Sequence, residues 1–409
     1  MSEWTRYKLK DISSLSNGIN FDKSAYTSGV KLIGVSDFKN RVYPDYDSLQ
    51  EVDPKVVRSG DYLEKGDIVF VRSNGNKELV GRCMMIDRDI PVTFSGFCIK
   101  LHINDKNNFE PAYFNYLFRT RQFKKSMTST AVGANIQNLS QSRLGNCEVS
   151  VPDIYTQKRI AAILSRYDFL IENYKQQISL LAESAQRLYK EWFVDLRFPG
   201  YENTKIIDGV PEGWKNAKLG DLAEFKRGKT ITKKEATEGI VPVVAGGLEP
   251  AYYCNKSNTD KRVITVSGSG ANAGYTKMYY EKVWASDCSF VDCSSTNYLY
   301  FAYCFLISNK STLDNMQKGA AQPHVYAKDL NAMELCAPTK ELLTLFEQSV
   351  IKHFDCISHI QSQINCLIEV RDRLLPKLMS GEISVETALS VTCGLGVRRE
   401  QTGSPQASD

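Results

Sequence analysis

The sequence predicts an α+β fold in which two mixed α/β domains, related by an internal repeat, are joined by two long helices. Three observations lead to this prediction. The chain has 409 residues, more than one hydrophobic core normally organises. Blocks of similar sequence open and close two halves of the chain in the same order, and a heptad stripe follows each closing block. A pseudo-twofold relation between the halves would make the two helices an antiparallel coiled coil.

The repeat is carried by an opening block and a closing block. Residues 4–12, which read Trp-x-x-x-Lys-Leu-x-Asp-Ile, recur at 214–222 with an offset of 210 residues. Residues 133–152 recur at 319–338 with an offset of 186, which continues through the segment that follows. The region between the blocks is therefore 24 residues longer in the first half. We interpret the two halves as one domain frame used twice.

Each closing block is followed by a predicted amphipathic helix. Apolar residues recur at heptad spacing from Ile160 to Trp192 and from Phe346 to Leu378. One such stripe is typical of ordinary helix packing, but two matched stripes favour helices that pack on each other. His353 and Arg371 interrupt the second stripe, and we expect looser packing where they lie.

Between the blocks, each half contains short β-rich runs that end in small polar loops. Residues 67–71 lead into the loop 73–76, and residues 262–266 lead into the loop 267–272. A helix with a basic cluster is predicted near residues 112–127. Proline-glycine elements mark a linker. The expected boundaries are a first globular domain at 1–153, a long helix at 154–197, a linker at 198–213, a second globular domain at 214–338, a long helix at 339–385 and a loose tail at 386–409.

Composition excludes several classes of protein. Hydrophobic residues make up 42% and charged residues 24%, as in ordinary globular chains, and no apolar run is long enough to cross a membrane. The amino terminus lacks the pattern of a signal peptide, so a cytoplasmic location is expected. The 11 scattered cysteines form no C-x-x-C pair, and we expect them to be reduced and bound to no metal. The net charge of +4 permits binding to a polyanion without requiring it.

Together, the two opening blocks, the two closing blocks, the helix after each and the linker ending Pro211-Glu212-Gly213-Trp214 resemble the specificity (S) subunit of type I restriction-modification systems. The resemblance spans nearly the whole chain. It implies a non-catalytic adaptor with two target-recognition domains, each reading one half of a split, asymmetric site in double-stranded DNA. The helices would act as spacer and as docking platform for methyltransferase (M) subunits, and restriction/translocase (R) subunits would join them. S-adenosylmethionine, ATP and magnesium would then bind to those partners and not to this chain.

The sequence lacks the catalytic motifs that were sought, as expected of a non-catalytic adaptor. There is no phosphate-binding G-x-x-x-x-G-K-[ST] loop and no Asn-Pro-Pro-Tyr or Asp-Pro-Pro-Tyr run. Pro44-Asp45 followed by Asp53-x-Lys55 matches a magnesium-dependent nuclease pattern, but a polar surface loop has the same letters. A self-contained restriction endonuclease therefore stays open as an alternative, as does a coiled-coil scaffold without DNA binding.

Reading DNA requires cations for phosphates and polar side chains for base edges. Each half is only slightly basic, so binding must come from local patches. The first-half candidates are Arg72, Ser73, Asn74, Asn76 and Lys77 on the loop after a strand, with Arg119, Arg121, Lys124 and Lys125 on the helix. The second-half candidates are Ser267, Ser269 and Asn272 on the matching loop, with Lys226, Arg227 and Lys229 and the nearby Lys233 and Lys234.

Two further groups of residues have more than one interpretation. Asn135 and Gln137, with Gln322 and His324 in the second half, lie in the closing blocks and suit either structural caps or DNA contacts. A basic run is itself often no more than a solvated face. No aromatic residue is assigned to base contact, because aromatic side chains mostly fill cores.

Overall fold

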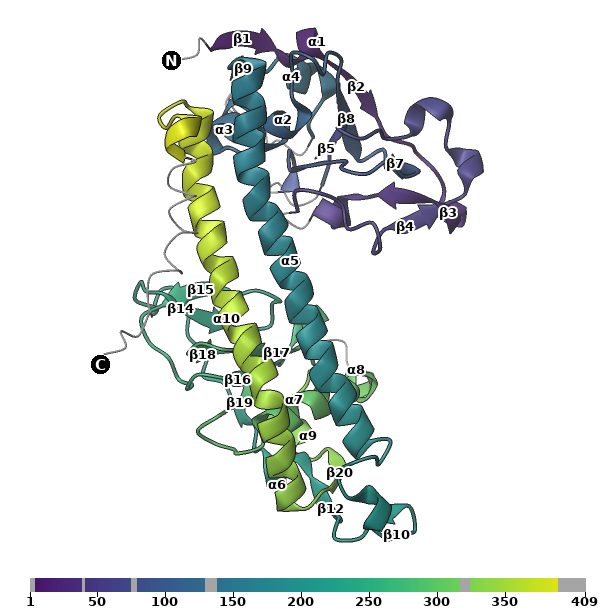
Figure 1. Ribbon diagram of the computed structural model, residues 1–409, viewed down its shortest axis with the longest axis vertical. Helices are drawn as coiled ribbons and strands as arrows, with labels where there is room; N and C mark the ends of the chain where they lie inside the picture. The colour runs from purple at the N-terminus through teal and green to yellow at the C-terminus, as the bar shows by residue number, and fades with distance from the viewer. Residues whose placement is uncertain (1–3, 39–40, 75–78, 129–137, 317–323, 389–409) are drawn as a thin grey trace, which may run out of the picture. The chain divides into compact units, whose positions relative to one another are not determined.

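The computed structural model describes residues 4–388 apart from 39–40, 75–78, 129–137 and 317–323. It divides into two compact units, the first made of Met1–Glu172 with Asn365–Asp409 and the second of Asn173–Ile364. We call them unit 1 and unit 2. The chain passes between them twice, once within each long helix (Figure 1). Within the described residues, no helix combines the length and apolarity needed to cross a membrane.

Unit 1 is built on two small sheets. A four-stranded sheet has the order β2-β8-β5-β6, and a three-stranded sheet has the order β4-β3-β7. Strand β5 (Ile68–Val71) is buried at every position because Ile68 and Phe70 enter one core while Val69 and Val71 enter another. The other strands are β2 (Ser13–Asn17), β3 (Tyr26–Ile33), β4 (Gln50–Val52), β6 (Cys83–Met85), β7 (Val92–Phe94) and β8 (Cys98–Ile103).

Unit 2 repeats this topology. Its sheets have the orders β13-β19-β16-β17 and β15-β14-β18, and its parallel pair, β14 with β18, matches the parallel pair β3 with β7. The central strand β16 (Val263–Ser267) is again buried throughout. The other strands are β13 (Lys226–Arg227), β14 (Val241–Val244), β15 (Tyr252–Cys254), β17 (Thr276–Tyr279), β18 (Trp284–Ala285) and β19 (Cys288–Asp292). The predicted internal repeat is confirmed.

In each unit the opening block and the closing block pair with each other. In unit 1, β1 (Thr5–Lys8) pairs antiparallel with β9 (Glu148–Val151), and in unit 2, β12 (Lys215–Lys218) pairs in the same way with β20 (Glu334–Ala337). Leu9 and Leu219, which follow the opening strands, are fully buried. Four short helices accompany these strands: α1 (Leu9–Ile12), α4 (Gln141–Gly145), α6 (Leu219–Leu222) and α9 (Ala327–Asn331). Strands β10 (Ile206–Ile207) and β11 (Val210–Pro211) form a hairpin in the linker.

The helix predicted near residues 112–127 is two helices, α2 (Pro111–Leu117) and α3 (Arg121–Thr128). Thr120 causes the break. Its hydroxyl donates to the carbonyl of Leu117 at 2.7 Å and accepts the N–H of Phe123 at 3.2 Å, so it ends one helix and caps the next. Unit 2 has a corresponding pair, α7 (Leu299–Ser308) and α8 (Lys310–Met316).

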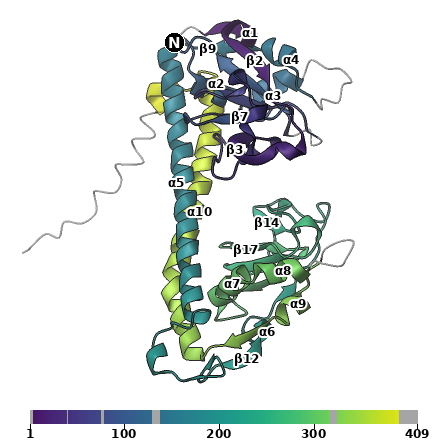
Figure 2. The same cartoon turned by 90° about the vertical axis from the view of Figure 1, so that its right-hand side faces the viewer.

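The long helices are α5 (Ile154–Phe193) and α10 (Lys340–Met379). In unit 1 the beginning of α5, at Ile160, shares a core with the end of α10, at Leu378. In unit 2 the end of α5 packs on the beginning of α10, where the rings of Trp192 and Phe346 lie 5.8 Å apart. Within each unit the two helices therefore pack side by side and antiparallel, as predicted (Figures 1 and 2).

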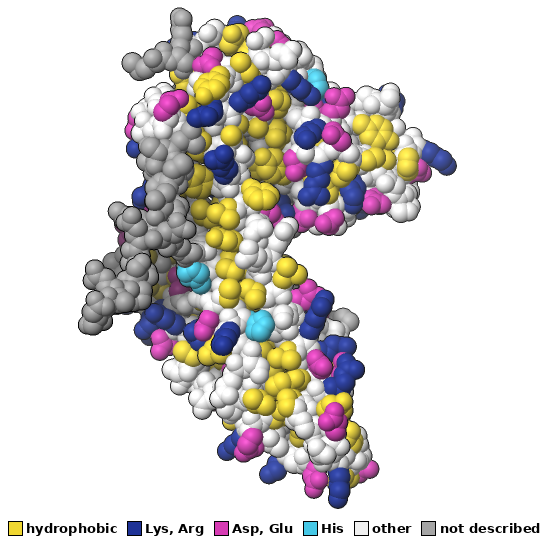
Figure 3. All heavy atoms as spheres, viewed as in Figure 1, with side chains coloured by type: hydrophobic (Ala, Val, Ile, Leu, Met, Phe, Trp, Pro, Cys, Tyr) yellow, Lys and Arg dark blue, Asp and Glu magenta, His cyan; other side chains and the backbone are white. Residues whose placement is uncertain are grey.

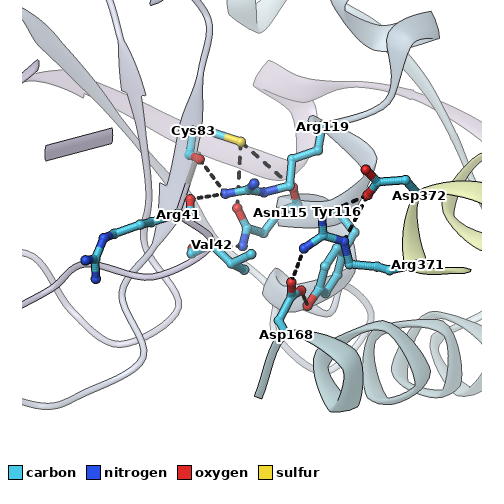
Figure 4. Close-up of polar contacts among 9 residues, drawn as sticks. All are labelled: Arg41, Val42, Cys83, Asn115, Tyr116, Arg119, Asp168, Arg371 and Asp372. Atoms are coloured by element: carbon cyan, nitrogen blue, oxygen red, sulfur yellow. Dashed lines mark hydrogen bonds and ion pairs between the residues drawn. The ribbon is translucent and has the colours of Figure 1, made fainter. Parts of the chain in front are cut away.

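The expectation of loose packing at Arg371 is wrong. Arg371 Nη1 lies 2.5 Å from Asp168 Oδ1 across the two helices, and Tyr116 of α2 donates its hydroxyl to Asp168 Oδ2 at 2.5 Å (Figure 4). The Asp168 side chain is only 7% exposed. Burial raises the pKa of Tyr116, which keeps the hydroxyl protonated as a donor. At the other interruption, His353 Nε2 lies 3.3 Å from Ser184 Oγ.

The first residues of the predicted loose tail, which begins at residue 386, pack into the core of unit 1. Val385 and Ala388 are buried against the cluster that contains Leu378. Order therefore extends past residue 386, and residues 389–409 lie outside the described part of the chain. The ten cysteines in the described residues are all free, and six of them are buried.

Candidate nucleic-acid interface

Four segments meet at one end of the four-stranded sheet of unit 1, and we call this meeting point the junction. They are Gly18 after β2, Arg72 after β5, Phe97 before β8 and Leu139 of the closing block. Backbone hydrogen bonds join them: Gly18 donates to Cys98 at 3.3 Å, Arg72 to Phe97 at 2.8 Å, and Leu139 to Arg72 at 2.8 Å. The loop after the central strand is thereby held against the recurring closing block.

Unit 2 has the same junction. Gly228 donates to Cys288 at 2.8 Å, Gly268 to Asp287 at 3.2 Å, and Val325 to Gly268 at 3.1 Å. An isolated antiparallel bridge adds to each junction, between Ser73 and Asn138 in unit 1 and between Ser269 and His324 in unit 2. The two units therefore present their loops on one shared backbone frame.

Glycine is required where the segment after the first strand of the sheet crosses the segment before β8 in unit 1 or before β19 in unit 2. A Cβ on Gly18 would lie 2.2 Å from the carbonyl oxygen of Phe94, and one on Gly228 would lie 2.3 Å from that of Ser286. Both distances are far below van der Waals contact, so any side chain would force the backbones apart. Gly18 and Gly228 are separated by the offset of the opening blocks, which extends this part of the repeat to the junction.

Side chains of unit 2 form a groove at the junction with a volume of about 380 Å³. Arg227, Asp287, His324 and Lys328 contribute charged or titratable groups to its lining. The ring of His324 stacks on Tyr326 at 5.5 Å, with an angle of 10° between the planes. The groove thus brings the predicted Arg227 next to the closing block, with one acidic side chain among the cations.

The remaining second-half candidates fall into two groups. Lys226 and Lys229 are exposed beside Arg227, on the segment that crosses the junction, and Lys233 and Lys234 are exposed farther along the same loop. Ser267 and Asn272 have internal roles, because each donates to the carbonyl oxygen of Gly246 at 3.2 Å. Ser269 is hydrogen-bonded to the carboxylate of Asp287.

Unit 1 has fewer described side chains at its junction. Arg72, Ser73 and Asn74 are half-buried, and Arg72 Nη1 lies 3.5 Å from the carbonyl oxygen of Gly96. Phe97 is 62% exposed, which is unusual for a phenylalanine. The predicted candidates Asn76, Lys77, Asn135, Gln137 and Gln322 lie outside the described residues.

The basic cluster of unit 1 is divided by the break between α2 and α3. Arg121, Lys124 and Lys125 are exposed on α3, whose opposite face buries Phe123 and Met127. Arg119 turns inward instead and donates to the carbonyl oxygens of Arg41 and, at 2.8 Å, of Cys83 (Figure 4). These contacts give Arg119 a structural role, so α3 retains three cations of the predicted four.

Sequence reasoning missed Phe97 and Asp287. Both lie directly before a cysteine that begins the strand beside the central one, Cys98 in unit 1 and Cys288 in unit 2. Aligning Cys98 with Cys288 would have shown that Phe97 and Asp287 are equivalent positions. Their offset of 190 differs from those of the opening and closing blocks, which hid the match.

The sequence model of the family described as "Type I restriction modification DNA specificity domain" matches residues 1–182 and 211–354. The chain belongs to this family. The two matched segments contain the two junctions, one in each segment. The protein is thus a DNA specificity subunit of a type I restriction-modification system, and its expected identity is confirmed.

Relatives of the chain carry the corresponding names. The MjaIX specificity subunit of Methanocaldococcus jannaschii is 28% identical over 310 residues, which cover 70% of this chain and 72% of the relative. The HindI specificity subunit of Haemophilus influenzae is 23% identical over 478 aligned positions, covering 94% of this chain and all of the relative. The crystal structure of a type I S subunit from M. genitalium shares the fold, with a TM-score of 0.56 at 18% identity over 92% of this chain and 96% of that one.

Proposed function

We propose that unit 1 and unit 2 each read one half of a bipartite, asymmetric site in double-stranded DNA, with the junction facing the bases. The observation that carries this proposal is one backbone frame that presents two different sets of side chains. Arg72, Asn74 and Phe97 lie at one junction, whereas Arg227, Asp287 and His324 lie at the other. Two different sets suit an asymmetric site, because identical sets would read the same half-site twice.

Exposed cations in each unit are suited to contact phosphates. In unit 2 these are Lys226, Arg227 and Lys229, and in unit 1 they are Arg121, Lys124 and Lys125 on α3. Phosphate contacts position a protein on the duplex and carry no sequence information themselves. Base reading is therefore assigned to the junction and positioning to these cations.

The long helices are proposed to bind the M subunits, and R subunits to join that complex. Hydrophobic side chains gather on the exposed surface of the helices (Figure 3). Among the described residues of α5 in unit 1, Tyr155 and Phe169 are exposed, the latter by 75%. Exposed apolar surface of this kind marks protein interfaces. S-adenosylmethionine, ATP and magnesium would bind to these partner subunits, since the sequence of this chain carries no motif for binding these cofactors.

The alternative of a self-contained nuclease finds no support in the contacts of its two aspartates. Asp45 pairs with Arg41 at 3.0 Å. Asp53 caps a short 3-10 helix by accepting the N–H of Lys55 at 2.9 Å. Both carboxylates are used in local structure, as expected of a surface loop.

The test is methylome sequencing of cells that express this chain together with its M subunit. The expected motif has two different half-sites separated by a spacer of unspecified sequence. Cells expressing the M subunit alone provide the control and should lack this motif. A palindromic or continuous motif that depends on this chain would overturn the proposal.

Arg121→Ala is expected to weaken binding of the assembled complex to all DNA sequences and to flatten its salt dependence. Loss of one phosphate contact should reduce the slope of log K against log salt by about 0.9. The control is Arg373→Ala on α10, which removes an arginine that is 77% exposed and far along the chain from the junction. Binding titrations at several KCl concentrations measure the slope, and an unchanged slope would remove α3 from the interface.

A further inference from the structure

Phe97 and Asp287 occupy equivalent positions at the two junctions. Each accepts, through its backbone carbonyl, the N–H of the residue that follows the central strand. The residue after Phe97 or Asp287 pairs with the last residue of the central strand. In unit 1 Cys98 pairs with Val71, and in unit 2 Cys288 pairs with Ser267. The shared frame therefore places a phenyl ring in unit 1 and a carboxylate in unit 2 at equivalent positions.

Both side chains are unusual for a surface that faces DNA. Phe97 leaves 62% of its area in water, although burial of apolar area is favourable by about 25 cal/mol per Å². Asp287 is exposed in a groove that also contains Arg227 and Lys328, and its negative charge repels phosphates. Neither side chain assists phosphate binding, whereas both are suited to contact base edges.

Asp287 is held in place within its groove. The Ser269 hydroxyl is hydrogen-bonded to Oδ2, and Ser269 is itself fixed by its bridge to His324. Since a carboxylate has further lone pairs on both oxygens, the group can still accept a hydrogen bond from a base. A positioned acceptor is what direct readout requires.

We propose that this position reads a base in each unit: Asp287 accepts a hydrogen bond from the N4 amino group of a cytosine, and Phe97 contacts the methyl group of a thymine. Cytosine is chosen because its major-groove edge offers a donor and no acceptor, whereas adenine, guanine and thymine all present acceptors that repel a carboxylate. Thymine is chosen because its methyl group is the apolar feature of that groove. This inference rests on the proposed function and adds the base chemistry.

The experiment is methylome sequencing of cells that express the M subunit with the wild-type chain or with a variant. Asp287→Ala should lose discrimination by about 5- to 150-fold at one cytosine of one half-site and leave the other half-site unchanged. Asp287→Asn keeps the shape and the bond to Ser269, and should shift that position toward adenine, because an amide matches the donor and acceptor of adenine. Phe97→Ala should relax an A·T pair in the other half-site only. Asp260→Ala is the control, since this exposed aspartate precedes β16 at the end away from the junction.

The outcomes separate this inference from the proposed function. A wild-type motif without two half-sites would overturn the proposed function. A bipartite wild-type motif that Asp287→Asn leaves unchanged, or relaxes at an A·T pair, would overturn the inference alone. Loss of all methylation with Asp287→Asn, in a complex that still assembles, would show that the negative charge is needed for binding to any DNA site and does not read one base, and would likewise overturn it.

Discussion

Replacement of Asp168 by alanine is expected to destabilise unit 1 by about 3 kcal/mol or more. The carboxylate of Asp168 accepts from Arg371 and Tyr116, so it ties α5 to α10 and to the globular part of unit 1. Its loss leaves the Arg371 guanidinium, whose side chain is 23% exposed, without its partner across the helix pair. Removal of one member of a buried ion pair typically costs about 3–5 kcal/mol, because the remaining charge is not compensated.

Native-state hydrogen exchange measures this loss within unit 1, through the protection of amides in α2 and in α10 after residue 365. The matched control is Asp372→Ala. Asp372 also contacts Arg371, at 2.8 Å, but its side chain is 57% exposed. An exposed pair contributes at most about 1 kcal/mol. Equal effects of the two substitutions would show that burial of Asp168 does not matter.

Insertion of seven residues into both long helices, after Glu172 in α5 and after Ile364 in α10, is expected to lengthen the spacer of the DNA site. The chain passes between the units at these two places, and a heptad preserves the register of the seam. Seven residues add about 10 Å at 1.5 Å per residue, which corresponds to roughly three base pairs at about 3.4 Å each. Both half-site sequences should stay the same.

Methylome sequencing of the double-insertion variant determines its spacer. Insertion of four residues in each helix is the control, because it shifts the seam out of register and should lower stability. If the heptad variant methylated the wild-type spacer as efficiently as the original chain, the helices would not set the distance between half-sites.

Recurring residues made the frame of this protein predictable. The opening and closing blocks recur because each pair forms the same two strands, β1 with β9 and β12 with β20. Heptad spacing placed Trp192 and Phe346 on seams, and the structure packs them together. Periodic burial leaves a periodic pattern in the sequence, so these features could be found without coordinates.

Long-range polar contacts could not be predicted in this way. Arg371 interrupts the seam in the sequence, and only the fold brings Asp168, 203 positions earlier, within hydrogen-bond distance. Arg119 was predicted to face DNA because it lies in a basic run, whereas the break at Thr120 lets it turn inward. Phe97 and Asp287 share no chemistry, so their equivalence appears only in the backbone hydrogen bonds.

The central claim, that each unit reads one half-site, is tested most directly by exchanging residues 1–150 for those of a relative with a different DNA site. The chimera is expressed with the M subunit and its methylated motif is sequenced. The account predicts that one half-site changes to that of the relative, while the other half-site and the spacer stay as in the wild type. A chimera in which both half-sites change, or neither does, would contradict it.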